Sequence, residues 1–229
     1  MPTANDTVSL GSTAYTVVKR AILRCQLTPG QQVSESQLAG QYGLGRAAVR
    51  TALSRLSQED LVQPVARSGH LIAPITLAGV RDVFDVRMHL EPPAARRAAG
   101  GGADLAVLRE LELACRAERY EPGDDDAVDR FLRANTALHV GIVAAGGNSR
   151  MAGIVRGLLE ASERFFHLAL GRTDRNDEMY HEHHDLIDAM VAGNPDQAHA
   201  VCVEQIEASK RMVVDALLST SDLRDVNLA

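Results

Sequence analysis

Apolar residues recur every three or four positions over most of the chain, which is the spacing of amphipathic helices. One such helix is expected over residues 10–24, with Ala21 and Ile22 on its buried face. Patterns typical of strands occur over residues 61–65 and 70–73, on either side of a glycine-containing turn. The pattern therefore predicts a mainly helical protein that contains one β-hairpin.

Residues 34–56 predict two short helices joined by a tight corner. Ser34 and Gln37 have the spacing of a capping box, in which the hydroxyl accepts from a free backbone N–H and the amide reaches back. Gly43 can adopt the positive φ that ends a helix. Gly45 is a permissible cap for the helix that follows.

The second of these helices has two distinct faces. Val49, Leu53 and Leu56 recur at i, i+4 and i+7, so they are expected to face the core. Arg46 and Arg50 are four positions apart and share a different face. Two arginines at the start of such a helix are typical of a helix-turn-helix that meets phosphates and base edges in the major groove. The alternative is a pair of core helices with solvated arginines.

The predicted hairpin directly follows this helix, which favours a winged helix-turn-helix. Arg67 would lie at the tip of the wing and reach the DNA backbone or the minor groove. This part of the chain resembles the winged helix of the GntR family of bacterial regulators. The resemblance rests on Leu38-Ala39, on the run Gly43-Leu44-Gly45-Arg46-Ala47-Ala48-Val49-Arg50-Thr51-Ala52-Leu53, and on Leu56, Leu61-Val62 and Gly69.

The resemblance implies which residues contact DNA: Arg46, Ala47, Ala48, Arg50, Arg67 and Gly69. This chain departs from the family pattern at two positions. Gly45 stands where the family commonly has Ser or Thr, and Ser36 stands where a basic residue is often found. Each departure removes a possible phosphate contact.

The charge of the chain is divided unevenly. Residues 1–80 hold seven Lys and Arg and four Asp and Glu, a net charge of +3. Residues 81–229 hold seventeen and twenty-six, a net charge of −9. This asymmetry directs nucleic acid to the first part and away from the second. Aromatic residues make up 3% of the chain and Trp is absent, which argues against a stacking platform for single-stranded nucleic acid.

Composition also limits the compartment and the type of site. Cys25, Cys115 and Cys202 are odd in number, far apart and outside any CxxC motif, so neither a disulfide scaffold nor a thiolate zinc site is expected. No apolar run approaches transmembrane length, and the N-terminus does not resemble a signal peptide. We therefore expect a cytoplasmic protein with no membrane partner.

The second part of the chain predicts an all-α antiparallel bundle of about six helices. They are expected near residues 77–99, 103–119, 125–145, 149–170, 177–192 and 195–219. Pro92 and Pro93 are expected to break or kink the first of them. The predicted organisation is a DNA-binding domain over residues 1–74, a linker over 75–79 and the helical domain over 80–229.

This helical part resembles the FCD effector-binding domain of the FadR subfamily of GntR regulators. The resemblance rests on Val86-Arg87 with Leu90-Glu91, on Leu138-His139 followed by Gly147-Asn148, and on Glu182-His183 with Ile187, Ala189 and Gly193. It implies that the helical part binds a small-molecule effector. The faces of its helices that are rich in Ala, Leu and Val would carry a dimer interface, or they could equally form the core of the bundle.

Asn135 and His139 are four positions apart on one predicted helix, so they share a face. From the residues alone, a hydrogen-bonded core histidine is an adequate interpretation, with residues 181–184 as a solvated helix start. The FCD resemblance implies instead a divalent metal such as Zn or Ni, held by an Asp, a His four positions on, and two later His residues. The matching positions here are Asn135, His139, His183 and Gln205.

The Asn and Gln departures weaken such a site. Asn loses the negative charge of Asp, and Gln replaces an imidazole nitrogen with a weak carbonyl donor. A metal on Asn135, His139 and His183 would therefore be bound weakly or completed by the carboxylate of the effector. The resemblance further implies that Arg87 faces an anionic effector, for which a guanidinium is suited. The alternative for Arg87 is an ion pair with Glu91, one turn on.

These features predict a ligand-responsive DNA-binding transcriptional regulator. It would act as a homodimer on a double-stranded operator, as a repressor released by a small carboxylate. The effector would be bound by Arg87, Asn135, His139, His183 and Gln205. An all-helical metal-dependent enzyme with an accessory N-terminal domain is the alternative, but no HExxH, GxSxG, P-loop or dinucleotide-binding turn occurs. We therefore expect no enzymatic activity, and a non-specific architectural DNA binder fits the charge distribution poorly.

Overall fold

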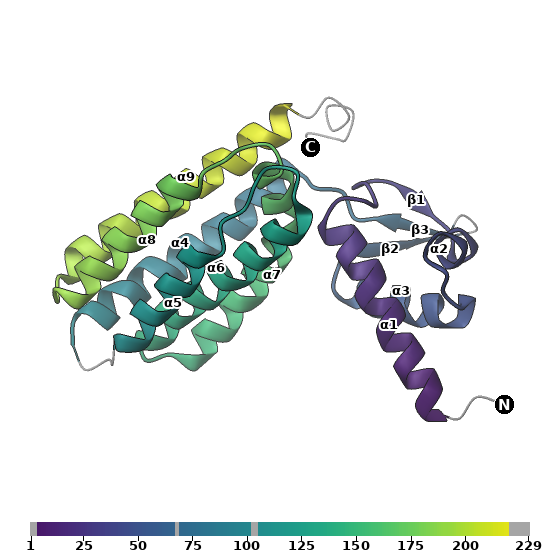
Figure 1. Ribbon diagram of the computed structural model, residues 1–229, viewed down its shortest axis with the longest axis horizontal. Coiled ribbons are helices and arrows are strands. Elements are labelled where there is room, and N and C mark those ends of the chain that lie inside the picture. Colours follow the sequence, from purple (N-terminus) through teal and green to yellow (C-terminus); the bar gives the residue numbers. More distant parts are fainter. Residues whose placement is uncertain (1–3, 67–68, 102–104, 220–229) are drawn as a thin grey trace. The chain divides into compact units, whose positions relative to one another are not determined.

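The computed structural model describes residues 4–66, 69–101 and 105–219. The chain divides into two compact units, Met1–Ile75 and Thr76–Ala229. The first contains α1 (Ala4–Leu23), β1 (Gln32–Val33), α2 (Glu35–Tyr42), α3 (Arg46–Gln58), β2 (Val62–Val65) and β3 (Gly69–Ile72). The three strands form an antiparallel sheet in the order β1-β3-β2 (Figure 1).

The local sequence explains the boundaries of α2 and the start of α3. Ser34 Oγ accepts from the Gln37 backbone N–H (3.2 Å), and Gln37 Oε1 accepts from the Ser34 N–H (2.9 Å), so the predicted capping box is confirmed. Gly43 ends α2 with a φ of 64°, and its N–H bonds the carbonyl of Ala39. Gly45 occupies the N-cap position of α3 without a side-chain cap.

The core of this first unit is apolar among the described residues. Helices α1 and α3 pack on each other, and α3 also contacts α2 and β2. The core contains Val18, Ala21, Ile22, Leu27, Val33, Leu38, Ala39, Val49, Leu53, Leu56, Leu61, Val62 and Ile72. The predicted inward face of α3 is therefore confirmed.

Two features of the first unit differ from the sequence-based expectation. Helix α1 begins at Ala4, earlier than residue 10. The wing also has a third strand, because Gln32 and Val33 pair with Leu71 and His70 of β3. A segment of two residues is too short to show the alternation that predicts a strand.

Gly69 is required where this third strand approaches the wing. Its φ is +94°, a conformation that other residues rarely adopt. A Cβ at this position would also lie 2.4 Å from the Val33 carbonyl oxygen. The backbone of β1 therefore leaves no room for a side chain at Gly69.

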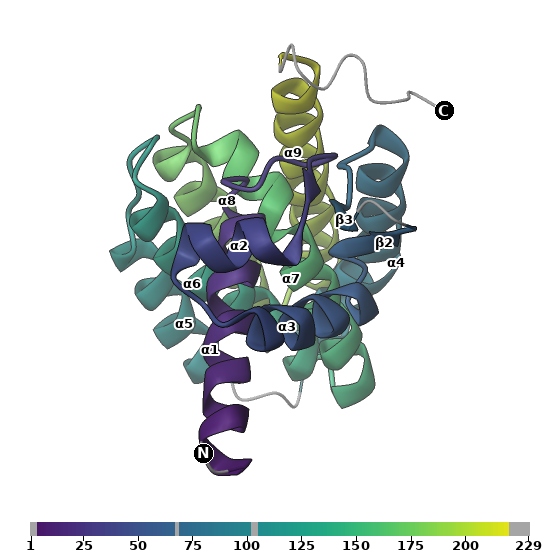
Figure 2. The same ribbon diagram turned by 90° about the vertical axis from the view of Figure 1, so that its right-hand side faces the viewer.

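The second unit is a bundle of α-helices (Figures 1 and 2). They are α4 (Leu77–Ala99), α5 (Ala106–Ala117), α6 (Asp125–Ala145), α7 (Ser149–Leu170), α8 (Asn176–Val191) and α9 (Pro195–Ser219). Helix α4 contacts α6, α7, α8 and α9, and α6 also packs on α5 and α7. A mainly helical protein with an N-terminal helix-turn-helix and a helical second half is confirmed.

Helix α4 has the expected bounds, but it overlaps the expected linker and its middle differs from expectation. Thr76 caps the helix by accepting from the Gly79 N–H (3.0 Å), so residues 77–79 of the expected linker belong to the helix. Pro92 and Pro93 lie inside α4 and do not break it. Since proline lacks an N–H, it removes one helical hydrogen bond without ending a helix that tertiary packing holds on several sides.

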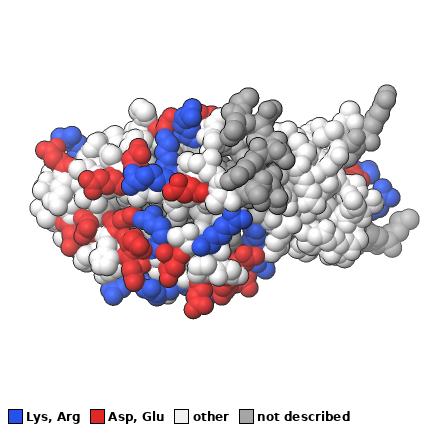
Figure 3. All heavy atoms as spheres, turned by 90° about the horizontal axis from the view of Figure 1, so that it is seen from above, with Lys and Arg blue, Asp and Glu red and all other residues white. Residues whose placement is uncertain are grey.

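The surface of the helical unit carries both signs of charge. Lys and Arg side chains are interspersed with Asp and Glu over the face shown in Figure 3. Among the described helices, none is long and apolar enough to cross a membrane.

Candidate functional site

The structure places Arg46 and Arg50 together on the exposed side of α3. The opposite side of the helix is fully buried, since Val49, Leu53 and Leu56 are each 0% exposed. Burial of one side fixes the rotation of the helix and holds both arginines toward solvent. This is the placement expected of a recognition helix.

Arg50 makes a contact that the sequence pattern did not indicate. Its Nε and Nη2 groups donate to the two carboxylate oxygens of Glu35 at the start of α2, each at 2.8 Å. These hydrogen bonds hold the pKa of Glu35 below its usual range. The Arg50 side chain remains 69% exposed, so the pair orients the guanidinium while leaving its outer edge open.

The other residues predicted to contact DNA differ in how exposed they are. Ala47 is exposed at the first turn of α3, and Ala48 beside it is half-buried. Gly69 begins β3 of the wing and is half-buried. Arg67, expected at the tip of the wing, lies outside the described residues.

Five polar residues predicted to bind effector or metal are all buried in the helical unit. Arg87 on α4 is 2% exposed, and Asn135 and His139 on α6 are each 4% exposed. His183 on α8 and Gln205 on α9 are each 3% exposed. We call these five residues, together with Glu91, the polar core. Four different helices contribute to it.

Glu91 joins two of the predicted residues. Arg87 Nε donates to Glu91 Oε1 (2.6 Å), and the second carboxylate oxygen lies 2.7 Å from His139 Nδ1. Burial alone would raise the pKa of Glu91, but Arg87 and His139 outweigh it and lower that pKa to about 2. The ion-pair alternative for Arg87 is therefore what the structure contains, and His139 is a hydrogen-bonded core histidine.

The two histidines of the polar core lie against each other. Their ring centroids are 5.5 Å apart in an edge-to-face arrangement. Burial, followed by repulsion from His139, lowers the pKa of His183 to about 3. His183 is therefore a neutral imidazole near pH 7, the form that binds a metal or accepts a hydrogen bond.

Several buried atoms of the polar core lack a hydrogen-bond partner among the described residues. They are Arg87 Nη1, Asn135 Oδ1, His183 Nε2 and Gln205 Oε1. An unpaired buried donor or acceptor costs about 1–3 kcal/mol, and native proteins contain few of them. A guanidinium donor, two amide oxygens and an imidazole nitrogen left unpaired in one set of residues indicate a ligand site. A small cavity of about 20 Å³, lined in part by His183, adjoins the set.

The donor set fits a divalent metal only partly. His139 presents its Nδ1 to Glu91, which leaves Nε2 for a ligand, the usual arrangement behind a metal-bound histidine. Asn135, His183 and Gln205 offer neutral donors, and the negative charge of Glu91 is already paired with Arg87. Within the described part of the chain, no three His, Cys, Asp or Glu residues could hold a metal ion.

The histidines around His183 are not a solvated helix start. Helix α8 begins at Asn176, so residues 181–184 lie well inside it. His184 Nδ1 lies 2.7 Å from Glu112 Oε1 on α5, and His181 Nδ1 lies 2.6 Å from the Asp177 carbonyl. Only the full set of helix contacts shows which of these side chains is internal.

Comparisons with known proteins agree with this two-part organisation. The GntR family of bacterial regulatory proteins matches residues 10–72, and the FCD domain matches residues 82–208. The HTH-type transcriptional repressor GlaR of Escherichia coli strain K12 is 28% identical over 181 residues, which are 78% of this chain and 82% of that protein. An HTH-type transcriptional regulator from the TAR-I ttuE-ttuC' intergenic region of Agrobacterium vitis is 33% identical over 139 residues, 56% of this chain and 81% of that protein.

A solved structure shows the same fold. E. coli McbR/YncC superimposes with a TM-score of 0.67 and 19% sequence identity, covering 90% of this chain and 97% of its own. At a sequence identity this low, the superposition supports a shared fold and no shared function. The FCD match covers more than half of the chain, so the chain belongs to the GntR family of bacterial regulatory proteins, and it is an HTH-type transcriptional regulator with an FCD domain and not an enzyme.

Proposed function

We propose that this regulator is a repressor whose release from operator DNA is controlled by a small organic acid bound in the polar core. The observation that carries the proposal is the set of unpaired atoms on Arg87, Asn135, His183 and Gln205. A carboxylate can accept from the free Nη1 group of Arg87. A hydroxyl on the same small molecule can donate to an amide oxygen, Asn135 Oδ1 or Gln205 Oε1. Resemblance to GlaR, which is named as a repressor, supports repression as the output.

Operator contacts would come from the exposed side of α3. Arg46 and Arg50 lie one turn apart there, where a bidentate guanidinium contact can distinguish guanine from other bases. The Glu35 carboxylate holds Arg50 in one orientation before DNA arrives. Pre-orientation reduces the side-chain entropy that is lost on binding.

The covalent connection between the units supports control by the effector. Helix α4 carries Arg87 and Glu91, and it begins at Leu77, two residues after the DNA-binding unit ends at Ile75. A ligand that draws Arg87 from its present partner acts on the helix to which the winged helix is attached. The coupling must be reciprocal, so operator DNA and effector change each other's affinity by the same factor.

A divalent metal such as Zn or Ni is the second candidate ligand of the polar core. Asn135, His139, His183 and Gln205 would hold it as neutral ligands. It would supply a positive charge that binds the carboxylate of the effector. Because no protein ligand in the set brings a free negative charge, we propose that metal binding is weak without the effector.

We propose that the regulator acts as a homodimer. A single winged helix buries few DNA contacts, and specific affinity usually requires two half-sites about one helical turn apart. Light scattering at micromolar concentration should give twice the chain mass. A monomer with full operator affinity would contradict the dimer.

Recognition by α3 is tested with Arg46→Ala and Arg50→Ala. Each change should weaken specific operator binding by roughly 1–3 kcal/mol if the arginine contacts a base edge. Binding to unrelated DNA should change less, and Arg133→Ala on α6 is a matched control in the other unit. Unchanged operator affinity in both α3 variants would exclude this helix as the recognition helix.

Metal analysis and an effector screen test which ligand the polar core binds. Asn135→Asp with Gln205→His restores an acidic and an imidazole ligand, so this double variant should retain more metal than the native chain when both are purified without chelator. Equal, near-zero metal content in both would favour a metal-free carboxylate site. Small carboxylic acids that lower the operator affinity of the native chain should not lower the operator affinity of the Asn135→Leu variant.

A further inference from the structure

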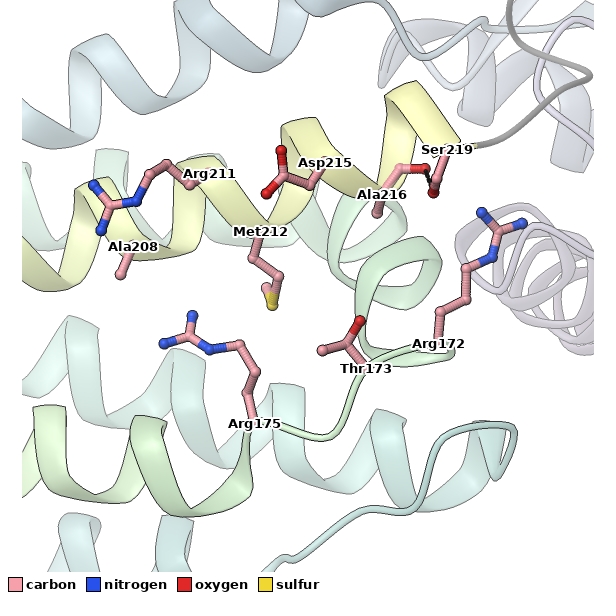
Figure 4. Close-up of a pocket in the computed structure, with 9 residues that line it drawn as sticks. All are labelled: Arg172, Thr173, Arg175, Ala208, Arg211, Met212, Asp215, Ala216 and Ser219. Atoms are coloured by element: carbon pink, nitrogen blue, oxygen red, sulfur yellow. Dashed lines mark hydrogen bonds between the residues drawn. The ribbon is translucent and has the colours of Figure 1, made fainter.

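A second cavity lies in the helical unit, away from the polar core. Its volume is about 500 Å³, within the range of small-molecule sites. One wall is the loop between α7 and α8, which carries Arg172 and Arg175, and the other is the C-terminal half of α9, which carries Arg211 and Asp215 (Figure 4). None of the polar-core residues lines it.

Arginines outnumber acidic residues in the lining of the cavity, although the helical part of the chain is acidic. Three arginines and one aspartate line it, whereas residues 81–229 as a whole carry a net charge of −9. Arg175 extends from the loop toward α9, Met212 projects from α9 toward the loop, and Arg211 runs along α9 (Figure 4). Guanidinium groups gathered in a cavity favour an anion, because several charge-assisted hydrogen bonds can reach one carboxylate or phosphate.

The two arginines have donors that are available to a ligand. Arg175 is half-buried and donates from Nη2 to Glu182 Oε1 at 2.6 Å, which leaves its Nε and Nη1 groups for another acceptor. Arg211 is exposed, and none of the ion pairs between described residues involves it. Arg175 is thus held in place by its own partner, while Arg211 is an exposed residue of the cavity lining.

Part of the α9 wall of the cavity is apolar. Ala208 and Met212 lie one turn apart on α9, and Met212 is 9% exposed. Their stripe offers contact to a short aliphatic chain and none to a fully hydrated inorganic ion. The cavity therefore combines an anionic end with an apolar surface.

We propose that this cavity is a second ligand site, for a small molecule with a carboxylate or phosphate group on a short apolar chain. Arg211 and Arg175 bind the anionic group, and Ala208 and Met212 contact the chain. The site is separate from the polar core and does not depend on what the polar core binds. Since Glu182 precedes His183 in α8, the partner of Arg175 is the nearest sequence connection between the two sites.

The test measures binding of hexanoate, hexyl phosphate and hexanol to the full chain by titration calorimetry at constant ionic strength. Both anions carry the same apolar chain, so the tighter of the two identifies the preferred anionic group. At least one anion should bind, and hexanol should not. Arg211→Gln should weaken that binding by about tenfold or more, because a hydrogen bond to a charged group is lost.

Two control variants locate the binding. Arg133→Gln removes an exposed arginine of α6 outside the cavity and should bind as the native chain does. His183→Gln changes the polar core and should also leave the hexyl anion affinity unchanged. Failure of both anions to bind, equal binding of hexanol, or an affinity that survives Arg211→Gln would overturn the proposal. Loss in His183→Gln alone would assign the anion to the polar core, so this outcome would overturn the second site and leave the proposed effector site standing.

Discussion

In the winged-helix unit, the described core is made of aliphatic side chains such as Ile22, Leu38 and Leu53, and the arginines that face DNA are exposed. In the helical unit, an arginine, a glutamate and two histidines lie among the most buried side chains. All of the buried polar and charged side chains identified in the described structure belong to this second unit.

The contrast follows from where each unit meets its ligand. DNA is too large to enter a protein, so recognition groups must project from a surface that an apolar core supports. A small molecule can be surrounded, so its recognition groups lie inside and must be held away from water. Buried polar groups weaken the free protein when they are unpaired, and they give specificity when a ligand pairs them.

The largest expected effect comes from removing one partner of the buried ion pair. Glu91→Leu leaves Arg87 charged and unpaired inside the helical unit, and breaking such a pair costs about 3–5 kcal/mol of unfolding free energy. Urea denaturation measures the loss, and hydrogen exchange should assign it to α4 and α6. The double variant Arg87→Met/Glu91→Leu should recover most of it. If Glu91→Leu is as stable as the native chain, the ion pair with Arg87 does not contribute to the free energy of unfolding.

A smaller loss is expected in the winged-helix unit, and it arises from the backbone. Gly69→Ala places a Cβ 2.4 Å from the Val33 carbonyl oxygen at a φ of +94°, so this variant should lose roughly 2–3 kcal/mol. Gly43→Ala is the matched control, since its φ is also positive but nothing lies within 4 Å of the added carbon. It should lose about 1 kcal/mol. Equal losses in the two variants would show that β1 yields to the new side chain.

The third effect depends on pH and belongs to the helical unit. The native pKa of His183 is lowered from 6.5 to about 3, so the unfolded chain binds more protons between these values. The contribution of His183 to the free energy of unfolding is therefore complete above about pH 6.5. It falls as the pH is lowered, and the loss is about 2 kcal/mol near pH 5. Denaturation of chelator-treated protein at a series of pH values measures this slope.

The variant His183→Gln sharpens the pH measurement. It should flatten the slope between about pH 7 and pH 5. Below about pH 4.5 the lowered pKa of Glu91 adds a second loss of the same sign. If the native protein shows the same slope as His183→Gln, protonation of His183 does not contribute to the pH dependence of stability.

The sequence by itself determined the features that depend on neighbouring residues. The capping box of Ser34 and Gln37, the left-handed Gly43 and the buried stripe of α3 all follow from residues a few positions apart. The helices of the second unit follow likewise from apolar periodicity and from the loops between them. Short-range interactions of this kind are the same wherever the chain folds, so a pattern can predict them.

Only the tertiary structure decided how distant residues combine. Four features join separate elements: the pairing of β1 with β3, the ion pair of Glu35 with Arg50, the contact of Glu91 with His139, and the cavity that both Arg175 and Arg211 line. The features that involve helices depend on the rotation and crossing of whole helices. Those rotations are set by packing of the complete apolar core, since a helix turns its most apolar side inward and carries its polar residues with it.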